Sequence, residues 1–208
     1  MTPLVTFIIP TIAGREDLFD QTLERIAKVA DSDLPNAKAQ VVVPENYPTI
    51  GEAWNAGMED AEGTYVWLGA DDALLAPGSI RAAIHFADER KWPSPRITNP
   101  NGSLHSCGTL GQGTHLDECA TRTRCYSSPF PFFARTYWNM IGPCIPVHYY
   151  ADDYLAWRAS AFGMSAVVVR EYEIQHLEGM VGRADVAARA FQDKDRMLEA
   201  IYAEHPCD

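Results

Sequence analysis

Apolar residues fall into short continuous runs separated by amphipathic stretches, the pattern of alternating buried strands and helices. The runs Leu4–Ile9, Gln40–Val43 and Thr64–Leu68 are rich in β-branched and aromatic residues, as expected for strands covered on both faces. Apolar residues at helical spacing follow Gly14 and extend again over Ile50–Ala61, which predicts a helix after each of the first two strands. Three strand–helix repeats in about eighty residues predict a mainly parallel sheet with right-handed crossovers.

The second half of the chain is less regular. Residues 92–128 are rich in Pro, Gly, Ser and Thr, and a structureless loop of this length is uncommon, so we expect short strands and turns there. Leu104, Leu110 and Leu116 are the expected anchors of this segment. The pattern then predicts a strand at 130–134, a short helix at 135–141, a helix at 152–162, strands at 166–169 and 173–176, and a last helix at about 184–203. There is no internal repeat and no linker, so one domain is expected.

Polar residues follow each of the three predicted parallel strands. Pro10-Thr11, Glu45-Asn46 and Asp71-Asp72 stand at the carboxyl ends of these strands, where ligands bind in sheets of this kind. Adjacent carboxylates at such a place can hold a hard divalent cation, because these ions prefer oxygen ligands. The alternative for Asp71-Asp72 is a turn in which Asp satisfies local backbone donors. The pair alone does not decide between the two.

Two further positions carry candidate chemistry. Asp152-Asp153 begins a predicted helix, where acidic residues commonly cap free N–H groups and favour the helix dipole. The functional alternative is a general base that takes a proton from an attacking hydroxyl. His176 ends a predicted strand, where it is either a packed residue or, together with a carboxylate, a ligand for Mn²⁺ or Mg²⁺.

The net charge and the composition mainly serve to exclude classes of function. The net charge of −11 makes nucleic acid an unlikely partner, because binding to a phosphate backbone depends on Lys and Arg. A nucleotide ligand remains compatible with this charge if a divalent cation offsets it. No apolar stretch approaches the ~20 residues of a membrane span, and no signal peptide is recognisable.

The cysteines suggest a compartment and one alternative metal site. Their number, five, is odd and there is no CxxC spacing, which predicts reduced thiols in the cytoplasm. A structural zinc is a second hypothesis because imidazoles and thiols are zinc ligands, although the spacing matches no standard zinc knuckle. Its candidate ligands are His105, Cys107, His115, Cys119 and Cys125.

In their order along the chain, these segments resemble the family 2 glycosyltransferases, inverting enzymes of the GT-A fold. The resemblance covers nearly the whole chain, and its strength lies in the order of the matches rather than in any one of them. The matching stretches are Val5–Thr11, Ala53–Gly57, Ala61–Val66, Leu68–Asp72, Phe132–Arg135 with Gly142, Asp152–Arg158 with Gly163, and His176.

The resemblance implies a fold and an activity. The fold is an α/β GT-A domain, a Rossmann-like and mostly parallel sheet flanked by helices, with residues 1–90 as the nucleotide-binding half and 91–208 as the acceptor-side half. The activity is the metal-dependent transfer of a sugar from a nucleotide-diphosphate sugar to an acceptor hydroxyl. Asp153 is implied as the general base, with Asp72 and His176 as ligands of Mn²⁺ or Mg²⁺.

The resemblance also implies which residues meet the substrates. Those expected at the nucleotide sugar are Pro10, Thr11, Arg15, Glu45, Asn55, Asp71 and Arg183. Aromatic residues expected near the acceptor are Tyr137, Trp138, Tyr149, Tyr150 and Trp157. The acceptor itself stays open between a protein side chain, a saccharide and a small metabolite.

The chain departs from the family pattern at three positions, which leaves the donor nucleotide undetermined. Gly69 replaces the first Asp of the usual Asp-x-Asp-Asp, Glu45-Asn46 replaces an Asp after the second strand, and Trp54 replaces an Arg. Two other functions remain as alternatives. One is a sugar-phosphate nucleotidyltransferase, although Thr11–Arg15 matches its glycine-rich basic loop poorly, and the other is a catalytically degenerate nucleotide-sugar-binding module.

Overall fold

A parallel sheet forms the amino-terminal half of the computed structural model, which describes residues 2–87, 91–107, 124–125, 128–177 and 184–204. Its elements are β1 (Val5–Ile8), α1 (Glu16–Asp33), β2 (Ala39–Val42), α2 (Ile50–Glu59), β3 (Tyr65–Leu68) and the antiparallel β8 (Phe132–Ala134). The strand order is β2-β1-β3-β8, and β1 is parallel to both neighbours. The predicted strand–helix repeats are confirmed, but β2 is a half-exposed edge strand rather than a buried one.

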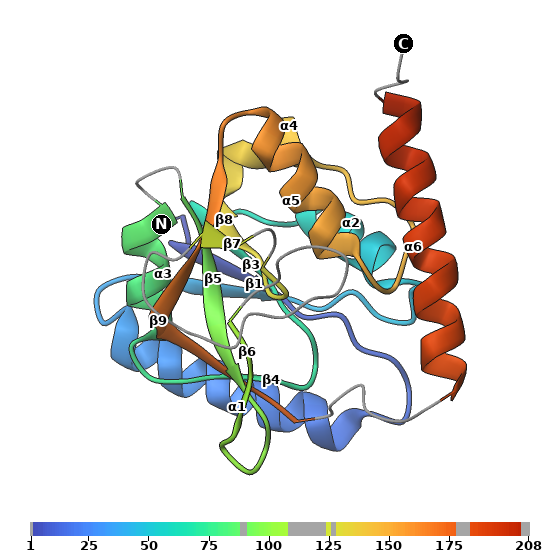
Figure 1. The fold of residues 1–208 in the computed structure, drawn as a ribbon. Coiled ribbons are helices and arrows are strands. Elements are labelled where there is room, and N and C mark those ends of the chain that lie inside the picture. The colour runs from blue at the N-terminus through green and yellow to red at the C-terminus, as the bar shows by residue number, and fades with distance from the viewer. Residues whose placement is uncertain (1, 88–90, 108–123, 126–127, 178–183, 205–208) are drawn as a thin grey trace.

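A second sheet lies beside the first (Figure 1). Its strands are β4 (Ala73–Leu75), β5 (Lys91–Thr98), β6 (Leu104–Ser106), β7 (Arg124–Cys125) and β9 (Ser165–His176). They are ordered β4-β9-β5-β6, with β7 also paired to β9. The two strands predicted at 166–169 and 173–176 are one strand, because an irregularity in register lets β9 continue along β5. Short strands in the irregular segment are confirmed, whereas the expected anchor Leu104 is exposed and Leu110 and Leu116 lie outside the described residues.

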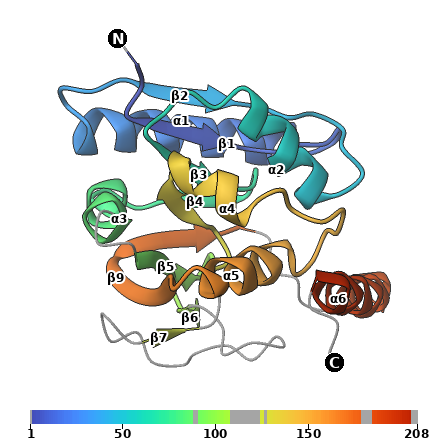
Figure 2. The ribbon, with the colours of Figure 1, turned by 90° about the horizontal axis from the view of Figure 1, so that it is seen from above.

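Four more α-helices lie within the described residues. They are α3 (Ser79–Ala87), α4 (Trp138–Ile141, after a 3₁₀ turn at Arg135–Tyr137), α5 (Ala151–Ala161) and α6 (Ala184–Glu204). Figure 2 shows the sheets and helices in layers, with α6 set to one side. The helices predicted after residues 135, 152 and 184 are therefore confirmed to within a residue or a short 3₁₀ turn.

The alternating side chains of β1 divide the core into two parts. Phe7 and its neighbours on the same face pack with α1, α3 and Trp67. Ile8 points the other way and packs with Trp54 of α2 and Leu155 of α5. A strand buried on both faces explains the uninterrupted apolar run in the sequence.

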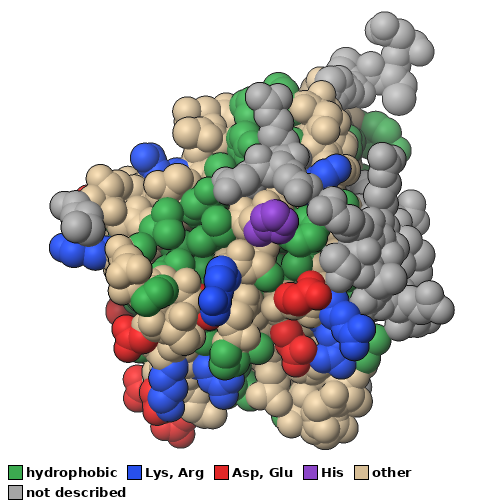
Figure 3. Space-filling view, turned by 90° about the vertical axis from the view of Figure 1, so that its left-hand side faces the viewer, with side chains coloured by type: hydrophobic (Ala, Val, Ile, Leu, Met, Phe, Trp, Pro, Cys, Tyr) green, Lys and Arg blue, Asp and Glu red, His purple; other side chains and the backbone are tan. Residues whose placement is uncertain are grey.

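The surface carries charges of both signs. Figure 3 shows the face that lies on the left of Figure 1, where Lys and Arg side chains lie among Asp and Glu rather than in one basic patch. Within the described residues, no helix combines the length and apolarity needed to cross a membrane.

Asp33 joins α1 to α3 through hydrogen bonds. Its carboxylate, only 5% exposed, accepts from the N–H of Gly78 at 2.8 Å and from that of Ile80 at 3.0 Å. The last residue of one helix thus satisfies N–H groups at the start of another, which would otherwise lack partners.

Replacing Asp33 by Ala is expected to lower the free energy of unfolding by about 1–3 kcal/mol, because the buried N–H groups lose their acceptor. Urea denaturation measures the change. Asp20→Ala, at an exposed position of the same helix, serves as the control and is expected to shift stability by less than about 0.5 kcal/mol. Equal effects of the two substitutions would contradict the capping role.

Candidate functional site

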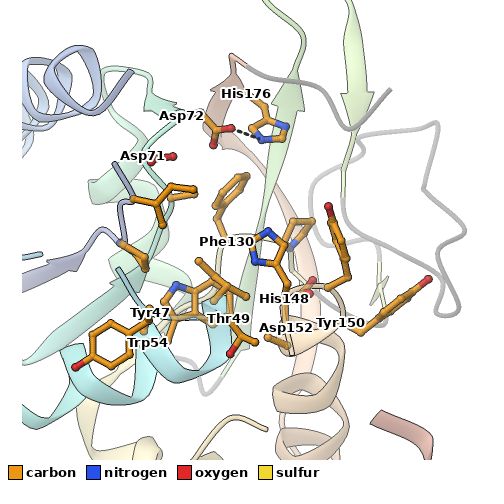
Figure 4. A pocket seen from close by; sticks show the side chains of 18 of the residues that line it. Tyr47, Thr49, Trp54, Asp71, Asp72, Phe130, His148, Tyr150, Asp152 and His176 are labelled. Atoms are coloured by element: carbon orange, nitrogen blue, oxygen red, sulfur yellow. Dashed lines mark ion pairs between the residues drawn. The ribbon is translucent and has the colours of Figure 1, made fainter. Parts of the chain in front are cut away.

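A cavity of about 910 Å³ opens at the carboxyl ends of β1 and β3. Figure 4 shows three groups of side chains around it: Asp71, Asp72 and His176 at one end, Tyr47, Thr49 and Trp54 on one wall, and His148, Tyr150 and Asp152 on another. These groups come from the end of β3, from α2 and the loop before it, from the first turn of α5 and the loop before it, and from the end of β9. Residues far apart in the sequence therefore share one space, as the strand-end argument predicts.

Asp71 and Asp72 are both buried, at 6% exposure, and Arg15 is bound to both. Its Nε lies 2.9 Å from each carboxylate oxygen of Asp71, and its Nη2 lies 2.8 Å from Asp71 Oδ1 and 2.9 Å from Asp72 Oδ2. Buried carboxylates need such partners because desolvation destabilises an unpaired charge. The pair is thus not a solvated turn.

The backbone of the acidic pair is fixed from two directions. The Thr22 hydroxyl of α1 donates to the carbonyl of Asp71 at 2.9 Å, and the Leu177 N–H after β9 donates to the carbonyl of Asp72 at 2.8 Å. Thr11 adds a side-chain hydrogen bond of 3.1 Å to Asp71 Oδ2. These hydrogen bonds hold the backbone of Asp71 and Asp72 in place and so restrict the positions of the two carboxylates.

His176 lies next to Asp72, with its Nε2 at 3.3 Å from Asp72 Oδ2. Burial alone would raise the pKa of Asp72, but His176 first and Arg15 next outweigh it, so this pKa lies below its ordinary value. Two ligands at right angles in an octahedral Mg²⁺ site, each about 2.1 Å from the ion, stand about 3 Å apart. The spacing of the two atoms therefore fits a shared divalent cation.

No group of three or more His, Cys, Asp or Glu side chains close enough to hold a metal occurs among the described residues. A cation at Asp72 and His176 would need further ligands from a bound substrate or water, which is usual for Mg²⁺ sites that face phosphates.

The zinc hypothesis is not supported where the structure describes its residues. Cys107 is disulfide-bonded, so its sulfur is not a thiolate ligand, and the expectation of reduced thiols is wrong for this residue. His105 lines the cavity, with its ring centroid 6.2 Å from that of His176. His115 and Cys119 lie outside the described residues, and the side chain of Cys125 is not described.

The start of α5 brings Asp152 and Asp153 to the cavity. Asp153 is 4% exposed, and the helix N-cap is Tyr150, whose φ of 65° is unusual for a non-glycine residue. Asp152 and Asp153 therefore occupy the first turn and not the cap. Burial raises the pKa of Tyr150, and the neighbouring Asp153 and Asp152 carboxylates raise it further.

Helix α6 holds the same wall in place. The buried Asp193 carboxylate accepts the N–H groups of His148 at 2.8 Å and Tyr149 at 3.0 Å. Arg189, one turn earlier, donates to the carbonyl of Pro48 at 2.8 Å and lines the cavity. Burial, followed by the charge of Arg189, lowers the pKa of His148.

The structure brings together most of the residues predicted for the nucleotide sugar, the metal and the general base. Those that line the cavity are Pro10, Thr11, Arg15, Asp71, Asp72, Asp153 and His176. Arg183 lies outside the described residues.

Two of the predicted residues lie elsewhere. Glu45 is exposed and does not line the cavity. Asn55 faces the loop after α4, where its amide donates to the Cys144 carbonyl at 2.9 Å and accepts the Cys144 N–H at 2.8 Å. Its visible role is to fix the segment that leads to the cavity wall.

Several lining residues were not predicted from the sequence. Tyr47, His148 and Arg189 carry no motif, and only the proximity of Tyr47 to a strand end gave a signal. Trp54 lies in the matching stretch Ala53–Gly57, where it stood out only as a departure from the family pattern. Among the aromatics expected near the acceptor, Tyr149 and Tyr150 line the cavity, whereas Trp138 stacks on Phe133 with centroids 6.1 Å apart.

Packing explains why glycine stands at the first position of the acidic signature. A Cβ at Gly69 would lie 2.4 Å from the ring of Trp67, which is fully buried. The Gly69 carbonyl also accepts the indole N–H of Trp54 at 3.0 Å. The ring of Trp67 therefore fills the space that an aspartate side chain would need, and Trp54 holds the Gly69 backbone against it.

Comparisons with known proteins identify the fold. No family model and no curated protein matches the sequence. The crystal structure of S. aureus TarS is similar, with a TM-score of 0.63 and 13% identity over 97% of this chain and 39% of that chain. The structure of GalNAc-T7 with UDP, GalNAc and Mn²⁺ has a TM-score of 0.58 and 11% identity over 95% of this chain and 48% of that chain.

The chain thus spans less than half the length of these two structures. Both are glycosyltransferases of the GT-A fold, and the predicted fold class is confirmed: a mixed α/β domain with sheets flanked by helices.

Introducing the family aspartate, Gly69→Asp, is expected to destabilise the protein by about 1–3 kcal/mol or more, because the core must yield to the new side chain. Thermal or urea denaturation measures the loss. Gly69→Asp combined with Trp67→Leu is expected to lose less than the sum of the two single changes, since the smaller residue relieves the clash. Strict additivity would show that Trp67 is not what excludes the aspartate.

Proposed function

We propose that this chain is an inverting family 2 glycosyltransferase that moves a sugar from a nucleotide-diphosphate sugar to an acceptor hydroxyl. One observation carries the proposal: the buried acidic pair, the Pro10–Thr11 segment and the Asp152–Asp153 helix start surround a single cavity of about 910 Å³. This volume is at the upper end for small-molecule sites, enough for a large ligand. The GT-A fold, and the UDP and Mn²⁺ in the GalNAc-T7 structure, support this assignment.

The nucleotide is proposed to lie against the wall formed by Pro10, Thr11, Tyr47 and Trp54. These residues line the cavity beside the acidic pair, and aromatic faces suit a planar base. Asp71 belongs to the acidic end and is hydrogen-bonded to Thr11 of this wall, a position that suits a contact to the donor ribose. Arg15 is placed to reach a phosphate, because a guanidinium matches phosphate oxygens with two parallel donors.

Asp72 and His176 are proposed to hold Mn²⁺ or Mg²⁺ through the two atoms that lie 3.3 Å apart. When bound there, a divalent cation acts as a Lewis acid that stabilises the negative charge developing on the leaving diphosphate. An imidazole ligand beside a carboxylate suits Mn²⁺ better than Mg²⁺.

Asp153 is proposed to act as the general base. Its carboxylate takes the proton of the acceptor hydroxyl while that oxygen attacks the anomeric carbon. The bond from this carbon to the diphosphate oxygen breaks, and its electron pair leaves with the diphosphate. Attack from the face opposite the leaving group inverts the configuration. The location of Asp153, buried in the first turn of α5 on the cavity wall, supports this role.

Asp153→Asn is expected to reduce sugar transfer by at least about 10²-fold, because general-base assistance is typically worth 10²–10⁴-fold. Donor binding, measured by calorimetry with the nucleotide product, is expected to change by less than about twofold, since Asp153 takes part only in the proton transfer.

Asp152→Asn is the matched control, because Asp152 lines the same cavity one residue earlier. It is expected to retain most of the transfer rate. A larger loss in Asp152→Asn than in Asp153→Asn would assign the base to Asp152 instead.

A screen of nucleotide sugars that measures release of nucleoside diphosphate tests the activity as a whole. Turnover is expected with Mn²⁺ and is expected to cease on addition of a chelator, because the diphosphate then loses its Lewis acid. Pyrophosphate release from a nucleoside triphosphate and a sugar phosphate would indicate the nucleotidyltransferase alternative. Donor binding without any hydrolysis or transfer would indicate a degenerate binding module.

A further inference from the structure

Arg15 already occupies the place where cation chemistry is proposed. Its guanidinium contacts both carboxylates, with Nη2 at 2.8 Å from Asp71 Oδ1 and 2.9 Å from Asp72 Oδ2. The Arg15 side chain is 25% exposed, while the side chains of Asp71 and Asp72 are 8% and 9% exposed. In this structure the acidic pair is thus neutralised in part by the protein itself.

A single carboxylate oxygen of Asp72 contacts both Arg15 and His176. Asp72 Oδ2 accepts from Arg15 and is also the oxygen that faces His176 Nε2 at 3.3 Å. A cation bound to this oxygen and to His176 would lie within a few ångströms of the guanidinium. Two positive charges that close, in a poorly solvated site, repel each other strongly. A divalent cation at this oxygen would therefore compete with Arg15 for Asp72.

A diphosphate bound in the cavity would offer new partners to the released guanidinium. Arg15 precedes α1 and lines the cavity next to Pro10 and Thr11. Arg15 and Arg189 are the only Lys or Arg side chains among the described lining residues, and Arg189 donates to the Pro48 carbonyl. In a chain of net charge −11, a diphosphate has few cations to bind, and Arg15 lies beside the acidic pair.

We propose that Arg15 is an exchangeable counter-ion that couples the cation to the diphosphate. Without ligand it holds Asp71 and Asp72, and it competes with a divalent cation for Asp72. A diphosphate in the cavity draws the guanidinium away, which frees Asp72 Oδ2 for the cation. The cation alone consequently binds weakly, and the cation and the diphosphate strengthen each other's binding by the same factor. This inference rests on the proposed function and adds how its site binds the cation and the diphosphate together.

The experiment measures Mn²⁺ binding to the full chain by electron paramagnetic resonance, without any nucleotide sugar. Arg15→Met removes the competing charge and is expected to raise Mn²⁺ affinity about tenfold or more, the size of a charged hydrogen bond. Arg189→Met is the matched control, because it removes one positive charge from the same cavity. It is expected to change Mn²⁺ affinity by less than about threefold, because the charge of Arg189 makes no contact with the acidic pair.

Inorganic pyrophosphate then tests the coupling, as a diphosphate probe that does not depend on the unknown base. With free Mn²⁺ corrected for the soluble manganese–pyrophosphate complex, pyrophosphate is expected to tighten Mn²⁺ binding in the natural protein. In Arg15→Met this enhancement is expected to be smaller by a factor of about ten or more, because the variant has no guanidinium that could move from Asp72 to the pyrophosphate. Arg15→Lys retains the charge and is expected to give intermediate values.

Two results would overturn the proposal. One is an unchanged or weaker Mn²⁺ affinity in an Arg15→Met protein that circular dichroism shows to be folded. The other is an equal gain in Arg189→Met, which would reduce the effect to the total charge of the cavity. The proposed function is tested separately by the nucleotide-sugar screen: a gain of Mn²⁺ affinity without any turnover would leave the counter-ion role intact and remove the transferase assignment.

Discussion

The arrangement of the site depends on one constraint: two adjacent carboxylates are buried at the end of β3 and must be compensated there. Asp71 and Asp72 are each only 6% exposed, and burial without partners would cost more than the protein's marginal stability allows. The carboxylates are compensated by Arg15 and Thr11 from the loop after β1 and by His176 from the end of β9. Thr22 of α1 and the N–H of Leu177 hold the carbonyls of the same two residues. The need to satisfy this pair therefore ties the two sheets together at the cavity.

A second buried acid organises the opposite wall. Asp193 of α6 binds the N–H groups of His148 and Tyr149, directly before the left-handed Tyr150 and the first turn of α5. Strained backbone of this kind persists only where its surroundings hold it. The hydrogen bonds from α6 and the clamp of Asn55 on Cys144 are such surroundings, and they set the position from which Asp152 and Asp153 face the cavity.

Two of the three departures from the pattern of the resembled family, Trp54 and Gly69, lie together in space. Trp54 stands where the family commonly has Arg, and its indole donates to Gly69, which stands where the family commonly has Asp. The ring of Trp67 fills the remaining space beside Gly69. Aromatic packing thus occupies two positions at which the resembled family commonly has an aspartate and an arginine. In this chain Arg15 is the cation that pairs with Asp71 and Asp72.

Local sequence determined the elements of this protein, because strand and helix patterns depend on neighbours along the chain. The runs ending at Pro10 and Asp71, and the helix that begins near Asp152, could be predicted in this way, and parallel topology then placed their ends together. The half-exposed state of β2, the continuous β9 and the capping of α3 by Asp33 depend on contacts between distant segments. The partners of the acidic pair also depend on contacts between distant segments. Burial and the direction of the side chains determine whether Asp71 and Asp72 contact water, a metal or Arg15. Only the tertiary structure sets these, because a buried charge takes its partner from whatever the fold brings within hydrogen-bond distance.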